Sequence, residues 1–173
     1  RFAWADEAAE VSRGVGLCAQ PAEASLLEAP HFIDLRSSRS RLTILTGGLP
    51  YHRRFGFRKL DSLLVVRGET ARRFRLGVGV DLTHRARDAA DFALGHCDFA
   101  LACPAPARSS GWLFHVESKN VLATHWEPVA AEGKAAGFRA HLLETEGRSV
   151  KTGLRCFRAP ASARKVDFLG QSL

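Results

Sequence analysis

A run of alternating side chains between positions 74 and 82 constrains the fold of this chain more than any other feature. Every second residue of the run is apolar, and the residues between them are Arg, Gly or Asp. A β-strand with one apolar and one polar face requires this period of two. The segment 150–156 alternates in the same way, and no segment shows an equally strong pattern at helical spacing. The sequence therefore predicts an antiparallel β protein. The apolar positions of the run are Phe74, Leu76, Val78, Val80 and Leu82.

Shorter apolar segments, separated by turn-forming residues, predict further strands. We expect hairpins between 112–116 and 121–126 and between 137–144 and 149–157, and an irregular crossover over 6–29. Helix is limited to one short segment within 83–91. About ten strands with so little helix are typical of an all-β fold, an antiparallel β-sandwich, and residues 1–173 are expected to form a single domain. The remaining strands are expected at 1–4, 31–35, 42–46, 60–66, 72–82, 97–103 and 164–168.

Composition excludes some classes of function. The chain has 173 residues, of which 46% are hydrophobic, but it contains no run of about 18 apolar residues that would span a membrane. Its formal net charge of +7 would suit a nucleic-acid partner, yet the 25 Lys and Arg residues are spread along the chain without a nucleic-acid-binding motif. We therefore expect neither a membrane nor a nucleic acid as partner. The chain lacks Met and opens on strand-like residues, so we expect it to be excised from a longer protein; no localisation is predicted.

The cysteines and histidines show no metal-binding spacing. The four cysteines form no C-x-x-C pair, and Cys97 and Cys103 are six positions apart, as either a small disulfide loop or two free thiols would allow. The seven histidines form no H-x-H or H-x-x-x-H pair. His115 and His125 have the best geometry, because the expected hairpin over 112–126 would bring them face to face. A structural histidine is the commoner state, so we assign no metal ligand.

The densest candidate site follows a strand break at Gly47-Gly48-Leu49-Pro50. We expect Tyr51, His52, Arg53 and Arg54 to project from a loop there. A Tyr ring can stack on a sugar face, and Arg and His can bond hydroxyl groups or anions. These four residues are the carbohydrate-binding candidates, and the alternative is a surface turn with solvated charges.

Two other features have structural explanations. Glu144 and Glu146 are two positions apart, as a pair of glycosidase carboxylates on one strand face would be. Arg148 is placed to pair with either, and we predict a structural ion pair between Glu144 and Arg148. Gly77 and Gly79 leave a bare strand face, which we expect a second sheet or a neighbouring domain to cover. With no nucleophile or phosphate-binding motif present, we assign no catalytic residue.

The order of motifs near the C-terminus resembles the C-terminal β domain of family-38 glycoside hydrolases, the α-mannosidase group. In that family an Asn-Val strand is followed by a strand that ends in a Glu-x-x-Gly-Arg-like turn, as in 119–124 and 137–148 here. The segments 150–157 and 163–169 continue the likeness, and 60–66 and 74–84 are similar to preceding segments of the family. The resemblance covers about two thirds of the chain, from about Leu42 to the end, and the segment 85–110 has no counterpart.

The resemblance implies a sandwich of the galactose-mutarotase-like supersandwich type. It also implies a non-catalytic domain that supports an N-terminal α/β barrel of the same polypeptide and contributes a loop to the carbohydrate site. In the family, the barrel supplies the catalytic aspartate and holds a zinc ion, and nothing in this chain matches either. We therefore expect no cofactor in this fragment, and no hydrolysis by it alone. The alternatives are a free-standing carbohydrate-binding module and, after it, a basic nucleic-acid-binding domain.

Overall fold

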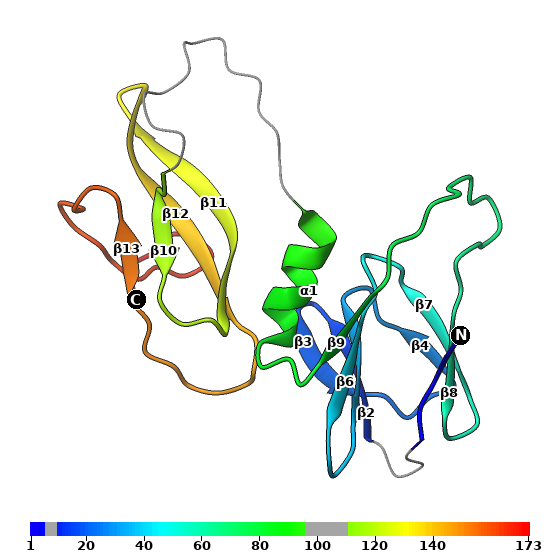
Figure 1. Ribbon diagram of the computed structural model, residues 1–173. Coiled ribbons are helices and arrows are strands. Elements are labelled where there is room, and N and C mark those ends of the chain that lie inside the picture. The colour runs from blue at the N-terminus through cyan, green and yellow to red at the C-terminus, as the bar shows by residue number, and fades with distance from the viewer. Residues whose placement is uncertain (6–9, 96–110) are drawn as a thin grey trace.

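The computed structural model describes residues 1–5, 10–95 and 111–173, which form thirteen strands and one helix (Figure 1). All paired strands are antiparallel, so the predicted all-β class is confirmed. The elements are β1 (Phe2–Ala3), β2 (Glu10–Val15), β3 (Cys18–Pro21), β4 (Leu26–Glu28), β5 (Phe32–Arg36), β6 (Arg41–Leu45), β7 (Tyr51–Phe55), β8 (Lys59–Ser62), β9 (Gly77–Val80), α1 (Arg85–Leu94), β10 (Phe114–Val116), β11 (Val121–Ala131), β12 (Lys134–Glu144) and β13 (Leu154–Cys156).

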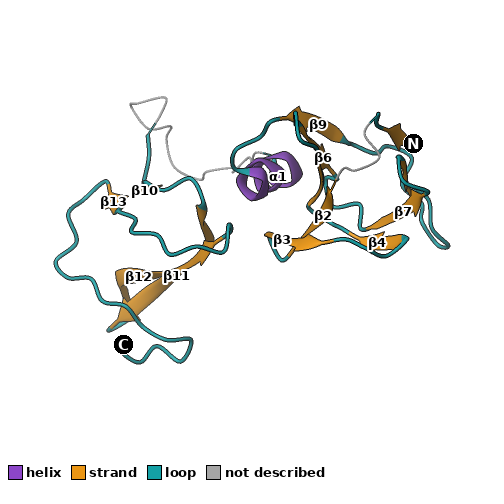
Figure 2. Ribbon diagram, turned by 90° about the horizontal axis from the view of Figure 1, so that it is seen from below, coloured by secondary structure: helices purple, strands orange, loops and turns teal. Residues whose placement is uncertain are grey.

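Two sheets from the N-terminal half face each other as a β-sandwich (Figures 1 and 2). One sheet has the strand order β1-β8-β7-β4 and the other the order β3-β2-β5-β6-β9. The core between them contains Leu27 and Leu60 from the smaller sheet and Ile33, Leu35 and Ile44 from the larger one. Their burial away from water is the main favourable contribution to holding the sheets together.

The larger sheet is buried on its second face as well, because α1 packs there. Phe32 and Leu45 are opposite each other on β5 and β6, and they contact Ala86 and Ala89 of the helix. The central strand β5 therefore sends alternate residues into two cores, which explains its nearly continuous burial. In the described residues, the structure has no helix long and apolar enough to cross a membrane.

The glycine face of the alternating run at 74–82 is covered by α1, where a second sheet or a neighbouring domain was expected. Only Gly77–Val80 forms a strand, β9, at the edge of the larger sheet. Gly77 lies against the Phe92 ring of α1, so the bare glycine face is the packed one. Val78 and Val80 lie on the face of the smaller sheet but remain 58% and 64% exposed. The apolar face is exposed because the smaller sheet does not extend over the edge strand.

The expected irregular crossover over 6–29 is wrong in its described part. Residues 10–21 form a hairpin, β2–β3, and β4 joins the smaller sheet. Gly16 and Leu17 make the two-residue turn, and both have positive φ angles, 58° and 64°. Turns of this kind match the right-handed twist of the flanking strands. A leucine at a positive φ is uncommon, so the sequence carried only half of the usual turn signal.

Four C-terminal strands form within or around the expected segments but pair differently, and the segment 164–168 has only a single bridge, between Val166 and Ser172, instead of the expected strand. β11 and β12 form one long hairpin that turns at Glu132 and Gly133. β10 pairs with β13, so the hairpins predicted for 112–126 and 137–157 are both wrong. The Phe114 ring stacks on the Trp126 ring with their centroids 4.2 Å apart, which packs β10 on the long hairpin. Cys97 and Cys103 lie outside the described residues.

A substitution at Gly14 would test the packing of the core between the larger sheet and α1. A Cβ atom added at Gly14 would lie 2.5 Å from the buried Phe32 ring, so one of the two groups must move. We expect Gly14→Ala to lower the free energy of unfolding by about 1–3 kcal/mol, measured by urea titration. Gly137→Ala is the matched control, because Gly137 is also in a strand and its added Cβ meets no atom within 4 Å. An equal loss in both variants would contradict the packing described.

Candidate functional site

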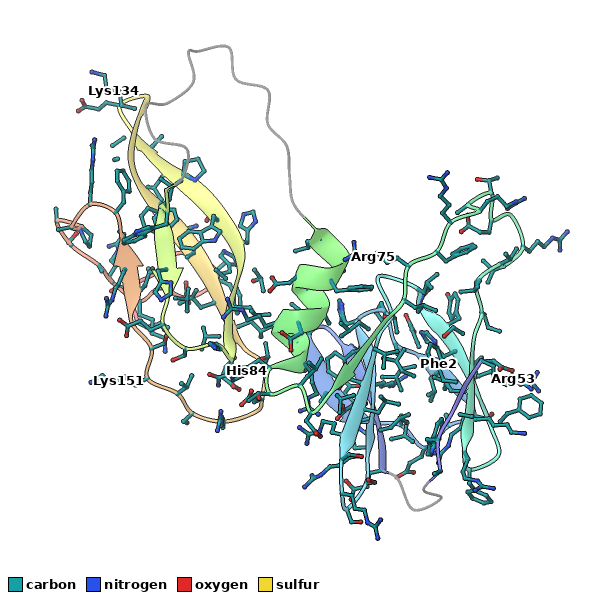
Figure 3. All side chains as sticks on the ribbon, in the orientation of Figure 1. Phe2, Arg53, Arg75, His84, Lys134 and Lys151 are labelled. Atoms are coloured by element: carbon teal, nitrogen blue, oxygen red, sulfur yellow. The ribbon has the colours of Figure 1, made fainter. Side chains whose placement is uncertain are left out.

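The four carbohydrate-binding candidates lie in strand β7 rather than in the predicted loop. Because side chains alternate along a strand, the four residues divide between two faces. Tyr51 and Arg53 are on the outer face of the smaller sheet, and Figure 3 shows Arg53 pointing away from the sandwich. His52 and Arg54 are on the face toward the larger sheet. The structure therefore brings only Tyr51 and Arg53 to one surface.

His52 is a buried structural histidine in this arrangement. Its side chain is 0% exposed. Its Nε2 donates to the Leu49 carbonyl oxygen at 2.9 Å, and its Nδ1 lies 3.0 Å from the Ser62 hydroxyl, which can donate to it. Burial lowers the pKa of His52 below its usual 6.5, against opposite effects of the Leu49 and Ala29 backbone groups. Its hydrogen bonds fix the chain after the Gly47–Pro50 turn, which the sequence pattern did not reveal.

The outer face of β7 carries an exposed row of three residues, Tyr51, Arg53 and Phe55, which we call the outer-sheet row. The Arg53 guanidinium carbon lies 4.8 Å from the centre of the Phe55 ring, a cation–π contact. An ion pair between Arg1 and Asp61, 2.7 Å long, borders the row. Phe55 was not among the residues predicted from the sequence, although its spacing of two from Arg53 was the available signal.

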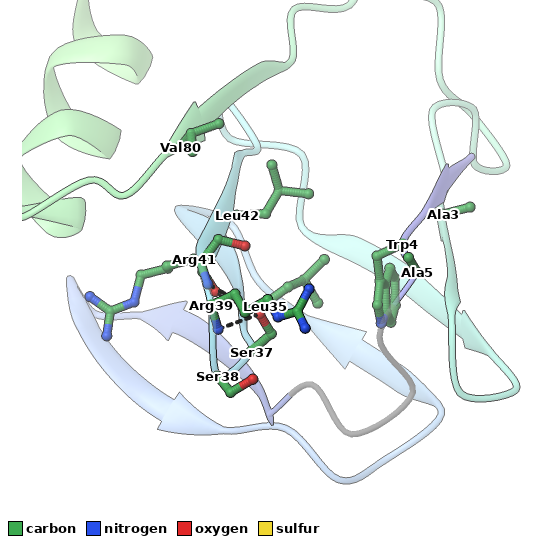
Figure 4. Close-up of a pocket in the computed structure, with 11 residues that line it drawn as sticks. Ala3, Trp4, Ala5, Leu35, Ser37, Ser38, Arg39, Arg41, Leu42 and Val80 are labelled. Carbon is green, nitrogen blue, oxygen red and sulfur yellow. Dashed lines mark hydrogen bonds between the residues drawn. The ribbon is translucent and has the colours of Figure 1, made fainter.

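A pocket of about 710 Å³ opens between the two sheets at the end of the β5–β6 hairpin (Figure 4). We call it the inter-sheet pocket. Its walls combine apolar side chains with the polar turn over 37–40. Sequence reasoning did not find it, because its residues come from segments that are distant in the chain. The lining residues are Ala3, Trp4, Ala5, Leu35, Ser37, Ser38, Arg39, Ser40, Arg41, Leu42 and Val80.

The predicted ion pair between the Glu144 and Arg148 side chains is wrong, because Arg148 pairs with a different carboxylate. The Arg148 guanidinium binds Glu146 at 2.6 Å, whereas Glu144 accepts only the backbone N–H of Arg148, at 2.9 Å. Glu144 also accepts bonds from the Asn120 amide at 2.7 Å and from the Glu146 N–H at 2.9 Å. Burial raises the pKa of Glu144, but these hydrogen bonds outweigh it and leave the pKa below 4.5. A low pKa suits an anchoring carboxylate and not a general acid.

Glu146 connects the C-terminal hairpin to α1. Its carboxylate lies 3.0 Å from Nδ1 of His84, the residue that precedes the helix (Figure 3). Leu122 of β11 packs in the same region, against the core between α1 and the larger sheet. The two carboxylates that resembled a glycosidase pair in the sequence thus have structural roles.

The expected pairing of His115 with His125 is also wrong. His115 is opposite Arg155 on β13, and His125 is opposite His141 on β12, with ring centres 5.3 Å apart. Among the residues that the structure describes, no three His, Cys, Asp or Glu side chains come together in a way that could hold a metal ion.

Comparison with known proteins finds no match for this chain among protein-family models, curated proteins or solved structures.

The buried His52 makes stability depend on pH. Its pKa in the folded chain is lowered, so the unfolded chain binds a proton more readily, and stability is lost as pH falls below about 6.5. We expect His52→Gln to weaken this dependence between pH 7.5 and 5.5, measured by urea titration at each pH. His31, whose pKa is also lowered by burial, accounts for a remaining slope. An unchanged slope in His52→Gln would contradict the assignment.

Proposed function

We propose that this chain is a non-catalytic C-terminal β-sandwich domain of an α-mannosidase-like glycoside hydrolase. Its partner would be the catalytic domain of the same polypeptide, which would hold the zinc ion. The motif order over 119–169 and the all-β sandwich support the proposal. The observation that carries it is an unusual exposure of apolar residues along the connection from β8 to β9.

These residues, which we call the apolar strip, are the run of four that follows β8 and the two valines of β9, which lie on the face toward the smaller sheet. All six residues have exposed side chains, and Val65 is 62% exposed. Apolar area left in water costs about 25 cal/mol per Å², and contiguous exposed patches mark interaction sites. A neighbouring domain that covered the strip would remove this cost. The six residues are Leu63, Leu64, Val65, Val66, Val78 and Val80.

The four consecutive apolar residues at the end of the segment 60–66 support this explanation. The sequence predicts a strand over the whole segment, but β8 ends at Ser62, and of the next four residues Leu63 donates one backbone hydrogen bond to Tyr51 of β7 without extending the strand. A run of four exposed apolar residues is costly to leave in water and is typical of a surface that another protein covers. A catalytic domain packed against the β8–β9 connection would cover this run.

Docking onto a catalytic domain can be tested with the two parts made separately. We expect this chain to bind the remainder of its polypeptide in trans, and Val65→Asp to weaken binding at least about tenfold, because a buried unpaired charge costs several kcal/mol. Leu169→Asp is the control, since Leu169 is also exposed, at 83%, but lies far from the strip in sequence. Calorimetric titration would measure both. Equal affinities of the two variants would reject the strip as the interface.

Activity measurements separate this proposal from an enzyme in its own right. We expect no hydrolysis of aryl α-mannosides by this chain alone, with or without added zinc. Turnover by the chain would reject the proposed role.

A free-standing carbohydrate-binding module is the second candidate, and the outer-sheet row favours it. Tyr51 and Phe55 present two rings on one exposed sheet face, with Arg53 between them. Aromatic rings stack on the apolar face of a sugar, and a guanidinium can bond its hydroxyl groups. This arrangement suits an extended saccharide rather than a single ring in a cavity.

A glycan array would test this second candidate. We expect Tyr51→Ala to reduce glycan binding by the lone chain about fivefold or more, through loss of one stacking contact. Because Tyr51 is exposed, the substitution should leave the unfolding midpoint nearly unchanged. Binding that persists undiminished in Tyr51→Ala would exclude the outer-sheet row as the binding surface.

A further inference from the structure

We propose that the inter-sheet pocket is a saccharide-binding site, separate from the outer-sheet row, in which Trp4 stacks on a pyranose ring and Arg39, Ser38 and Ser40 bond its hydroxyl groups. The choice of mannosides as the first ligands to test rests on the proposed function. The assignment of a saccharide does not, because it follows from the lining of the pocket.

The size of the pocket suits a small ligand. Its volume of about 710 Å³ lies within the range of about 300–1,000 Å³ that is common for ligand pockets. It opens at the end of the sandwich, where the β5–β6 turn and the chain around Trp4 form opposite sides (Figure 4). A ligand of one or two rings could therefore enter from solvent without the two sheets separating.

The apolar walls match the C–H face of a sugar ring. Figure 4 shows the Trp4 ring standing on one side of the pocket and Leu42 and Val80 on the other. Trp4 also packs against the core between the sheets, which fixes its ring. A fixed aromatic ring loses little conformational freedom when a ligand stacks on it, and this favours binding.

The turn over 37–40 supplies the hydrogen-bonding side. The Ser37 hydroxyl accepts the N–H groups of Arg39 and Ser40 and donates to the Ser40 carbonyl oxygen, each at 3.2 Å. These bonds hold the turn in one shape. Within the described part of the chain, the Ser38 and Ser40 hydroxyls and the Arg39 guanidinium have no such partner, so they are available to a ligand.

Arg39 and Arg41 differ in a way that identifies the ligand-facing group. The Arg41 guanidinium lies 3.2 Å from the buried Asp34 carboxylate, on the α1 side of the larger sheet. Arg39 lies in the turn, and its side chain extends toward Trp4 (Figure 4). None of the eleven lining residues is acidic, so the pocket suits a neutral or anionic ligand and not a cation.

The test is titration of the 173-residue chain with α-linked mannobioses, with cellobiose and a sulfated disaccharide as comparison ligands. Two-dimensional NMR of the labelled chain would follow the Trp4 indole N–H signal, assigned by its loss in Trp4→Phe. We expect a mannobiose to shift this signal in a saturable way. Arg39→Ala should weaken binding about tenfold, the typical effect of removing one hydrogen bond from a charged donor.

A second variant distinguishes a loss of ligand binding from a loss of folding. Val80→Trp fills the pocket from an exposed position on an edge strand, so it should abolish binding while keeping the polar turn. Arg164→Ala, at an exposed arginine outside the pocket, is the matched control and should bind like the original chain. Tyr51→Ala should also bind normally, which separates the pocket from the outer-sheet row.

The outcomes bear differently on the two proposals. The pocket proposal would be overturned if no saccharide gave a saturable shift, or if Arg39→Ala and Val80→Trp both bound as tightly as the original chain. Either result would leave docking on a catalytic domain intact. Pocket binding of cellobiose but not of mannobiose would support a saccharide site and count against the α-mannosidase assignment. Binding of the sulfated disaccharide alone would overturn the stacking of a neutral ring as the basis of recognition.

Discussion

The burial of the central pair β5–β6 on both of its faces is the constraint on which the rest of the structure depends. Ile33 and Ile44 fill the core of the sandwich, while Phe32 and Leu45 fill the core beneath α1. A single pair of strands thus joins the smaller sheet, the larger sheet and the helix. Any shift of its register by one residue would exchange the two sets of side chains and expose both cores.

A buried carboxylate reinforces this arrangement. Asp34 is 2% exposed on the helix side of β5, where it binds Arg41, Arg85 of α1 and the Thr43 hydroxyl. A buried charge is tolerated only when it is paired, so Asp34 ties the start of the helix to the sheet. The same interaction holds the Arg41 guanidinium away from the inter-sheet pocket. The polar chemistry of that pocket is therefore left to Arg39 and its neighbouring serines.

The sequence predicted the class of fold well and the exposure of its strands less well. Strands β5 and β6 could be predicted because each is a dense apolar segment bounded by turn residues. The alternation at 74–82 was real, but alternation says only that two faces differ and not which one is buried. Phe92 of α1 selects the glycine face, and that contact comes from a residue after the strand. The pairing of β10 with β13 was beyond prediction for the same reason, because it joins segments far apart in the chain.

The prediction of functional residues from the sequence is limited in the same way, because contacts between distant segments decide which side chains share a surface. Tyr51, His52, Arg53 and Arg54 attracted attention as a cluster in sequence, yet a strand separates neighbours onto opposite faces and buries His52 between the sheets. Residues that share a surface in a sandwich are two apart in one strand or come from different strands. Trp4, Arg39 and Val80 come together from the residue after β1, the β5–β6 turn and β9, although nothing in their spacing suggests it. In an all-β chain, therefore, a ligand site is more readily recognised from the register between strands than from a cluster along the sequence.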